Sequence, residues 1–426
     1  MKANSPIFYM LLFFCLPYFT MGQLKEVQKI KPVQELEIRE GLPNFFAKAS
    51  KGDAIKVAYL GGSITAQEGW RVKSLGWFKQ RFPNASFSEI NAAIGGTASD
   101  FGAFRLSDQV LKFNPDLVFV EFAVNDDGAP AEKIIRTIEG IVRQIWQHNP
   151  YTDICFIYTT KQTYLKAAPN GQLPETAEVM EKVAEKYQIP TINFGFEVAK
   201  LVNNNQLVIR GESSELKGVK VFSSDGVHPY IETGHAIYQS VIMRSFESMI
   251  DSKPGKPSKH TLKKPLADDC YSNPQMIDFT AGELSKNWEI LQIKDVSAFK
   301  NFGQFLTKFG KASQSGESLT IRFKGKTIGV YDFMGPDAGK VQVEIDGIVK
   351  DTVSRFDPWC TYMRMNYFFI DHLEDKNHVG VFRLLSDPFD KAVILAKIGN
   401  VMVKPDDYKE NNWYVAKILV DGVLLP

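Results

Sequence analysis

Cysteine is scarce in this chain, with four residues among 426. So few cysteines cannot form the disulfide framework that holds small secreted domains together. Cys155 lies inside an apolar run and is interpreted as a small core residue, whereas a bridge between Cys270 and Cys360 stays open. The fold must therefore depend on hydrophobic cores, and the chain is long enough for two or three domains.

An excess of charge of either sign is also absent, because 50 basic residues stand against 49 acidic ones. A chain without such an excess has no long-range attraction for nucleic acids or anionic membranes. Its His, Cys, Asp and Glu residues show no metal-ligand spacing either. We expect a small or neutral substrate, no nucleic-acid partner and no metal.

Apolar runs long enough for a transmembrane helix are absent too. Residues 1–22 carry one positive charge, a short apolar core and small residues at Thr20 and Gly22, a pattern typical of a secretory signal peptide cut before Gln23. The apolar core is short for a transmembrane helix, and no later segment is long enough to span a bilayer. The sequence predicts an exported protein, periplasmic or extracellular, with no stable membrane insertion.

Residues 23–250 are predicted to form one α/β domain. Apolar runs alternate with helix-period segments, among them the stripe of Ala131–Asn149 and a closing helix from about Glu232 to Met249. This alternation predicts a parallel sheet with helices on both faces. The expected strands are Ile55–Leu60, Phe87–Ala92, Leu117–Val124, Ile154–Thr159 and Thr191–Phe194.

Residues 251–273 are polar, contain prolines and lack periodicity, so we interpret them as a linker. Residues 274–426 show short strands separated by turn residues at Lys324-Gly-Lys, Gly335–Gly339 and Asp346-Gly. This pattern predicts an antiparallel, jelly-roll-like β-sandwich domain. The expected strands are Leu319–Phe323, Thr327–Phe333, Val341–Ile345, Val379–Leu384, Val393–Ile398 and Tyr414–Val420.

Ser63 is the first residue with a candidate chemical role. It follows the buried run that begins at Ala54 and ends at Gly61 and Gly62, so it lies at the carboxyl edge of the sheet, where open α/β folds place their sites. A serine hydroxyl becomes a nucleophile only when a base takes its proton. Without such a partner, Gly-Gly-Ser is an ordinary turn.

His228 has the setting of that base. It lies in the loop Ser224-Asp-Gly-Val-His-Pro-Tyr230, just before the last helix of the domain. The spacing from Asp225 allows the carboxylate to fold back onto Nδ1 of the imidazole, which leaves Nε2 free to accept a proton. His235, seven residues later and within the helix pattern, is interpreted as structural.

Two further loops follow predicted strands. In Ala93–Gly102, the glycines Gly95 and Gly96 allow a backbone N–H to approach a ligand closely, although the same loop reads as a strand-to-helix turn capped by Ser99 or Asp100. After the third strand, Asn125 offers a carboxamide donor. Four such pieces along one sheet edge favour a catalytic site over four separate turns.

In this order the four pieces resemble the SGNH, or GDSL-type, hydrolase superfamily, over roughly Lys51–Ile250. The matching motifs are Gly61-Gly-Ser63-Ile-Thr, Ile94-Gly-Gly96-Thr-Ala-Ser, Val124-Asn125-Asp126 and Asp225-x-x-His228. The resemblance implies a three-layer α/β/α, flavodoxin-like fold and ester hydrolysis through an acyl-serine intermediate, with no cofactor. One departure is Gly62, which stands where the family usually has aspartate.

The resemblance also implies roles for single residues. Ser63 would be the nucleophile, His228 the base and Asp225 the residue that orients it. The oxyanion hole would comprise the backbone N–H groups of Ser63 and Gly96 and the side chain of Asn125, with Gly95 as the alternative to Gly96.

Exported members of this superfamily with an added β-sandwich resemble carbohydrate esterases. The expected partner is therefore an acetylated carbohydrate, a plant-type glycan such as xylan, xyloglucan or pectin. Trp70 and Arg71 are candidates for binding the sugar, and the second domain adds aromatic residues that are either core or glycan-binding. These are Trp359, Tyr362, Tyr367, Trp413 and Tyr414.

Two alternatives stay open. One is a lipase, lysophospholipase or thioesterase on the same fold, and the other is a catalytically inactive carbohydrate-binding protein. The sequence predicts no oligomeric state.

Overall fold

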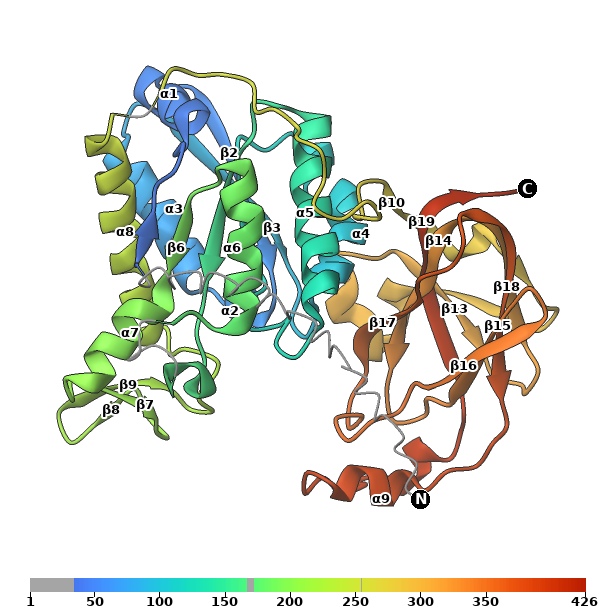
Figure 1. Cartoon of the computed structure of the whole chain (residues 1–426). Helices are drawn as coiled ribbons and strands as arrows, with labels where there is room; N and C mark the ends of the chain where they lie inside the picture. Colours follow the sequence, from blue (N-terminus) through green and yellow to red (C-terminus); the bar gives the residue numbers. More distant parts are fainter. Residues whose placement is uncertain (1–33, 167–171, 254) are drawn as a thin grey trace, which may run out of the picture. The chain divides into compact units, whose positions relative to one another are not determined.

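A six-stranded sheet forms the centre of the first domain (Figure 1). The computed structural model describes residues 34–166, 172–253 and 255–426, so the predicted signal peptide lies outside the described residues. The strand order is β1-β6-β5-β4-β2-β3, with β2 to β6 parallel and β1 antiparallel at the edge. All five predicted strands are present, and the order of the parallel strands is that of flavodoxin-like folds. The strands are β1 (Leu36–Glu37), β2 (Ala54–Gly61), β3 (Ser86–Ala93), β4 (Leu117–Glu121), β5 (Asp153–Tyr158) and β6 (Thr191–Asn193).

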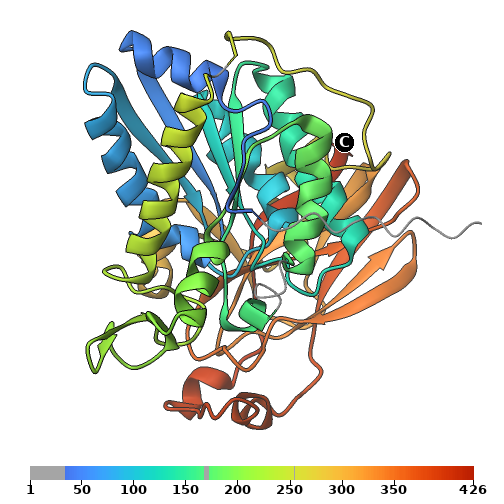
Figure 2. The ribbon, with the colours of Figure 1, turned by 60° about the vertical axis from the view of Figure 1, so that its left-hand side comes forward.

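Helices cover both faces of this sheet, as Figure 2 shows. Successive strand side chains alternate between the faces, so that Val57 and Tyr59 belong to a different core cluster from Ala58 and Leu60. Helices α1, α3 and α8 contribute to the first cluster, and α4, α5 and α6 to the second. The helices are α1 (Pro43–Lys51), α2 (Ser63–Ala66), α3 (Trp70–Arg81), α4 (Ser99–Gln109), α5 (Ala131–His148), α6 (Glu175–Tyr187), α7 (Phe194–Asn203) and α8 (Gly234–Asp251).

Strand β4 ends three residues earlier than predicted. Phe122 and Ala123 are fully buried, which explains why the sequence pattern extends the strand to Val124. The chain nevertheless turns after Glu121, and residues 123–128 form turns. Asn125 consequently lies in a turn at the carboxyl edge of the sheet, where the site was expected.

A small second sheet was not predicted. Strands β7 (Leu207–Arg210), β8 (Glu215–Leu216) and β9 (Val219–Ser223) pair in the order β7-β9-β8. Strand β9 ends directly before the Asp225–His228 loop. This sheet therefore anchors the start of the loop that carries the candidate base.

The second domain is an antiparallel β domain, as predicted. Its ten strands form one continuous hydrogen-bonded network, because the long strands β14 and β19 each pair with several partners. In the sequence, residues 252, 253 and 255–273, which carry no helix or strand, lie between α8 and this domain. The strands are β10 (Pro274–Asp278), β11 (Glu283–Leu284), β12 (Glu289–Gln292), β13 (Lys308–Ala312), β14 (Ser318–Met334), β15 (Lys340–Ile345), β16 (Ile348–Ser354), β17 (Arg364–Ile370), β18 (Lys376–Leu385) and β19 (Trp413–Leu424).

Two local predictions in this domain are wrong. Lys324-Gly-Lys is not a turn but a bulge within β14, where a side chain on Gly325 would lie 2.2 Å from the Asp421 carbonyl oxygen. Residues Val393–Ile398 do not form a strand, because helix α9 (Lys391–Ala396) occupies them. The Asp390 carboxylate caps this helix by accepting a hydrogen bond from the Val393 N–H, which the apolar pattern alone does not reveal.

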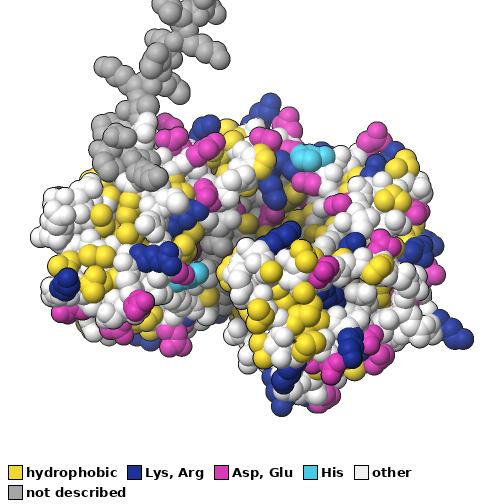
Figure 3. All heavy atoms as spheres, turned by 90° about the horizontal axis from the view of Figure 1, so that it is seen from below, with side chains coloured by type: hydrophobic (Ala, Val, Ile, Leu, Met, Phe, Trp, Pro, Cys, Tyr) yellow, Lys and Arg dark blue, Asp and Glu magenta, His cyan; other side chains and the backbone are white. Residues whose placement is uncertain are grey.

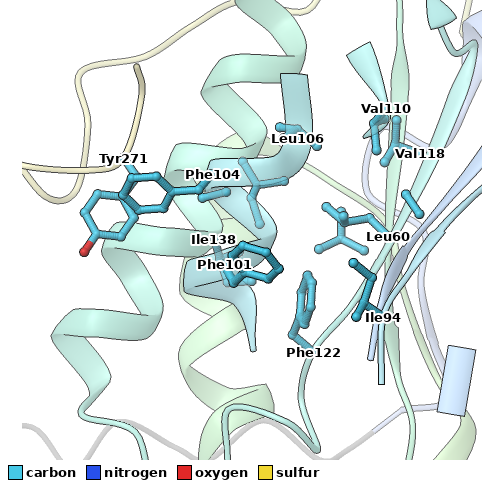
Figure 4. Close-up of a cluster of buried hydrophobic side chains, with 14 of the residues drawn as sticks. Leu60, Ile94, Phe101, Phe104, Leu106, Val110, Val118, Phe122, Ile138 and Tyr271 are labelled. Atoms are coloured by element: carbon cyan, nitrogen blue, oxygen red, sulfur yellow. The ribbon is translucent and has the colours of Figure 1, made fainter. Parts of the chain in front are cut away.

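The two domains share one core cluster. Figure 4 shows part of it, where Phe101 and Phe104 of α4 lie between strand residues such as Leu60 and the ring of Tyr271.

An ion pair also connects the two domains. Arg136 of α5 donates hydrogen bonds to both carboxylate oxygens of Asp371, which directly follows β17, at 2.9 and 3.2 Å. Partial burial opposes ionisation of Asp371, but this pairing outweighs it and holds the pKa well below its usual range.

The aromatic residues of the second domain divide into two groups. Trp413 and Tyr414 are buried, so the glycan-binding alternative is wrong for them. Tyr367 is half-buried and packs against α4. Trp359 and Tyr362 are each 59% exposed, so solvent reaches these two rings.

Candidate active site

Ser63 stands at the start of α2, one residue beyond the turn that ends β2. Its Oγ lies 2.8 Å from Nε2 of His228, although the two residues are 165 positions apart in the chain. This distance is that of a hydrogen bond between a nucleophile and a general base. The fold therefore brings together the two residues that the sequence motifs single out.

The His228 loop is closed tightly upon itself. Ser223 pairs with Pro229 in an isolated bridge, and the Ser223 Oγ accepts a hydrogen bond of 2.6 Å from the Gly226 N–H. Gly226 adopts φ +84°, a conformation that a side chain would strain. These contacts fix the turn between the carboxylate and the imidazole.

Asp225 is engaged on both of its oxygens. Oδ1 accepts hydrogen bonds of 2.8 Å from the N–H groups of Val227 and His228, and Oδ2 lies 2.6 Å from Nδ1 of His228. Partial burial raises the pKa of Asp225, but these hydrogen bonds, the one from the His228 ring first, outweigh it and leave the pKa below its usual value. The carboxylate therefore remains charged and orients the ring.

Two segments flank Ser63: the glycine loop, which comprises residues 95–98, and the turn that carries Asn125. A Cβ built on Gly95 would lie 3.5 Å from the Cβ of Ser63, so the loop backbone passes directly beside the serine. Gly96 is exposed and adopts φ +72°. The Asn125 carboxamide covers Gly62, and its Oδ1 is buried without a hydrogen-bond partner among the described residues.

A comparison with known families gives a match within this domain. Residues 59–230 match the model of the GDSL-like lipase/acylhydrolase family, and this range contains all four motifs. The α/β domain belongs to this family. No curated protein matches the chain.

Comparison with solved structures extends the likeness to the second domain. A two-domain esterase (CEX) active on acetylated mannans is 21% identical with a TM-score of 0.69, covering 90% of this chain and 95% of that chain. The structure co-crystallised with mannopentaose has a TM-score of 0.67 at 21% identity, covering 91% and 98%. At this identity the likeness shows that both domains share their fold with that esterase.

Gly62, the departure from the usual motif of this family, has a steric reason. A Cβ at this position would lie 2.0 Å from the Oδ1 of Asn125. No side chain fits between the turn and the carboxamide unless Asn125 moves. In this GDSL-like domain, glycine at position 62 and the observed place of Asn125 therefore depend on each other.

A buried glutamate beneath the nucleophile turn was missed by the sequence reasoning. Glu121, at the end of β4, is fully buried and accepts hydrogen bonds of 2.7 Å from the hydroxyls of Thr65 and Thr159. Burial raises its pKa, and the hydroxyls together with the Gly62 N–H oppose the rise. The sequence did contain a signal for this buried glutamate, because Glu121 directly follows the apolar run Leu117–Val120.

His235 is structural, as predicted, and it connects two loops of the site. Its Nδ1 accepts a hydrogen bond of 3.1 Å from the Trp70 N–H, and its Nε2 lies 3.1 Å from Oε1 of Gln67. Burial lowers the pKa of His235 to about 3, so the ring is neutral. It ties the start of α3 to the segment that follows His228.

The prediction that Trp70 and Arg71 bind sugar is wrong. Trp70 is completely buried, with its ring packed against Tyr59, Phe119 and Phe194. Arg71 is 4% exposed and donates to the Thr65 carbonyl and to Glu89. Both side chains hold α3 against the sheet, and neither presents a surface to a ligand.

Within residues 34–166, 172–253 and 255–426, no group of three or more His, Cys, Asp or Glu side chains is arranged to hold a metal ion. Cys155, Cys270 and Cys360 are free thiols, so the bridge left open above is not formed. Of the helices described, none has the length and apolar character needed to cross a membrane.

Proposed function

We propose that this protein is a serine esterase that removes O-acetyl groups from a polysaccharide or oligosaccharide. The observation that carries the proposal is the continuous hydrogen-bonded chain from Ser63 Oγ through His228 to Asp225, at 2.8 and 2.6 Å. In a GDSL-like hydrolase domain, this chain is the arrangement required for acyl transfer to serine.

The proposed reaction has two stages. Nε2 of His228 takes the proton of Ser63 while Oγ attacks the acetyl carbonyl carbon, and the developing oxyanion is stabilised by the N–H groups of Ser63 and Gly96 and by Asn125. The imidazolium then protonates the leaving sugar oxygen. Water, deprotonated by the same nitrogen, hydrolyses the acetyl-serine to acetate.

Three observations support a carbohydrate substrate. The esterase whose two-domain fold this chain shares acts on acetylated mannans. The chain carries a formal net charge of +1, and Figure 3 shows basic and acidic side chains interspersed over the face that lies at the bottom of Figure 1. A surface without a strong field is suited to a neutral polymer.

The test is acetate release from a panel of acetylated glycans, including mannan, xylan, xyloglucan and pectin. The mature protein is compared with Ser63→Ala, and p-nitrophenyl esters of increasing acyl length are measured in parallel. Acetate release that the substitution abolishes is the expected result. Hydrolysis of long acyl esters with no release from any glycan would contradict the proposal and favour a lipase or thioesterase.

We also propose that the protein is exported, on the basis of residues 1–22. Expression with the native amino end, followed by amino-terminal sequencing of the protein recovered outside the cytoplasm, tests this. A mature chain that begins at Gln23 is expected, and full-length protein retained inside the cell would contradict it.

A further inference from the structure

The loop from Gly95 to Ala98 is held from both sides. On the side of the α/β domain, the Ile94 N–H donates 3.1 Å to the Gly61 carbonyl, and the Ser99 N–H donates 2.9 Å to Oδ1 of Asp126. The Ala98 N–H has a partner from the other domain, the hydroxyl of Tyr367 at 3.2 Å. One strand of the β domain thus reaches the loop beside Ser63.

Tyr367 lies in β17 and is fixed in place by its other contacts. Its hydroxyl donates a 2.6 Å hydrogen bond to Oδ1 of Asp100, which is 3% exposed and paired with Lys133 at 2.6 Å. Its ring stacks on Phe101 at a centroid distance of 4.7 Å. Burial and the neighbouring carboxylate raise the pKa of Tyr367 well above its usual value, so the hydroxyl stays protonated.

We infer that the β domain is part of the catalytic apparatus, because Tyr367 positions the backbone of the loop that supplies the Gly96 donor. This inference rests on the proposed function. Tyr367 acts as a positioning residue, since its hydroxyl contacts Ala98, two residues beyond Gly96, and not the substrate. Oxyanion donors are effective only when they are held in place before the reaction begins.

The neighbouring strand provides a matched control. Tyr331 of β14 stands directly opposite Tyr367 in the ladder, and its ring also contacts Phe101, at 4.7 Å. Its hydroxyl, however, contacts the sulfur of Met365 within the β domain and makes no hydrogen bond to the glycine loop. Tyr331→Phe therefore removes the same atom at the same interface without touching the loop.

The experiment compares the wild type, Tyr367→Phe and Tyr331→Phe in the full chain. Two experiments are made on each protein: hydrogen–deuterium exchange of peptides spanning residues 94–99, and steady-state kinetics with p-nitrophenyl acetate, which give kcat and KM. In Tyr367→Phe the Ala98 amide should exchange faster and kcat should fall roughly tenfold, with KM changed less than about twofold. Tyr331→Phe should resemble the wild type in both.

The outcomes separate this inference from the proposed function. Unchanged exchange in Tyr367→Phe, or a kcat equal to that of Tyr331→Phe, overturns the positioning role while the wild type is still an active esterase. A fall in kcat of the same size in both variants shows a general effect of the interface and overturns it too. An inactive wild type overturns the proposed function and, with it, the catalytic part of this inference.

Discussion

Two aspartate–histidine pairs in different domains have nearly the same geometry. In the α/β domain, Asp225 lies 2.6 Å from Nδ1 of His228, and in the β domain, Asp346 lies 2.7 Å from Nδ1 of His378. Both aspartates also accept hydrogen bonds from backbone N–H groups of the loop or strand that carries the histidine. The carboxylate therefore does not distinguish the two pairs.

The second ring nitrogen does distinguish them. Nε2 of His228 lies 2.8 Å from the Ser63 hydroxyl, and its side chain is 40% exposed. Nε2 of His378 lies 2.8 Å from the carbonyl oxygen of Glu374, and its side chain is 4% exposed. The buried ring of His378 has hydrogen-bond partners on both nitrogens, so it fastens β18 to the turn between β15 and β16. The ring of His228 faces a hydroxyl and is available for proton transfer.

Substituting each histidine should separate the two pairs most strongly. His228→Ala removes the base, so kcat for p-nitrophenyl acetate should fall by roughly 10²- to 10⁴-fold with little change in melting temperature. His378→Ala should lower the melting temperature and leave kcat within about twofold. Equal losses of activity in the two variants would show that the Ser63 contact is not what separates the pairs.

Asn125 offers a second way to compare the two pairs. It is the proposed oxyanion donor beside Ser63, the nucleophile that His228 faces. Removal of one oxyanion donor typically reduces turnover by roughly 10²- to 10³-fold, so Asn125→Ala should be severely impaired but not inactive. Asn377→Ala, at the exposed neighbour of His378, serves as the control and should retain full activity. Steady-state kinetics decide the matter, and full activity in Asn125→Ala would refute its assigned role.

Asp126 is expected to affect stability rather than turnover. Burial, opposed by hydrogen bonds from Ser99, raises its pKa from 3.8 to about 7. The folded state then keeps a proton that the unfolded state releases, so the free energy of unfolding should fall as the pH rises from about 4 to about 7. Asp126→Asn cannot titrate and should escape this loss, which amounts to about 4 kcal/mol at most.

Melting temperatures of the wild type and Asp126→Asn at pH 5 and pH 8 test this. The wild type should lose more stability between the two values than the variant does. Parallel changes in the two proteins would show that Asp126 ionises normally in the folded state.

The sequence was informative where function depends on short motifs. Ser63, Asp225 and His228 could be grouped because each lies close in sequence to glycine or proline residues, and the structure brings these three residues together. The parallel sheet and the antiparallel second domain followed from hydrophobic periodicity.

The sequence was misleading or silent where tertiary packing decides. Trp70 looks like a sugar platform by its nearness to Ser63, but helix α3 turns it into the core. Tyr367 is 269 residues from Ala98, whose N–H donates a hydrogen bond to the tyrosine hydroxyl, and no local sequence pattern encodes that contact. The apolar run from Val393 to Ile398 favoured a strand, but the segment forms helix α9, whose first turn is capped by Asp390.

The central claim, that Ser63 is a nucleophile activated by His228, is tested most directly by covalent labelling. The wild type, Ser63→Ala and His228→Ala are incubated with a serine-directed fluorophosphonate, and the adduct is quantified by intact mass and located by peptide mapping. We expect one adduct on Ser63 in the wild type, none in Ser63→Ala and strongly slowed labelling in His228→Ala. An unlabelled wild type, or an adduct on another residue, would contradict the claim.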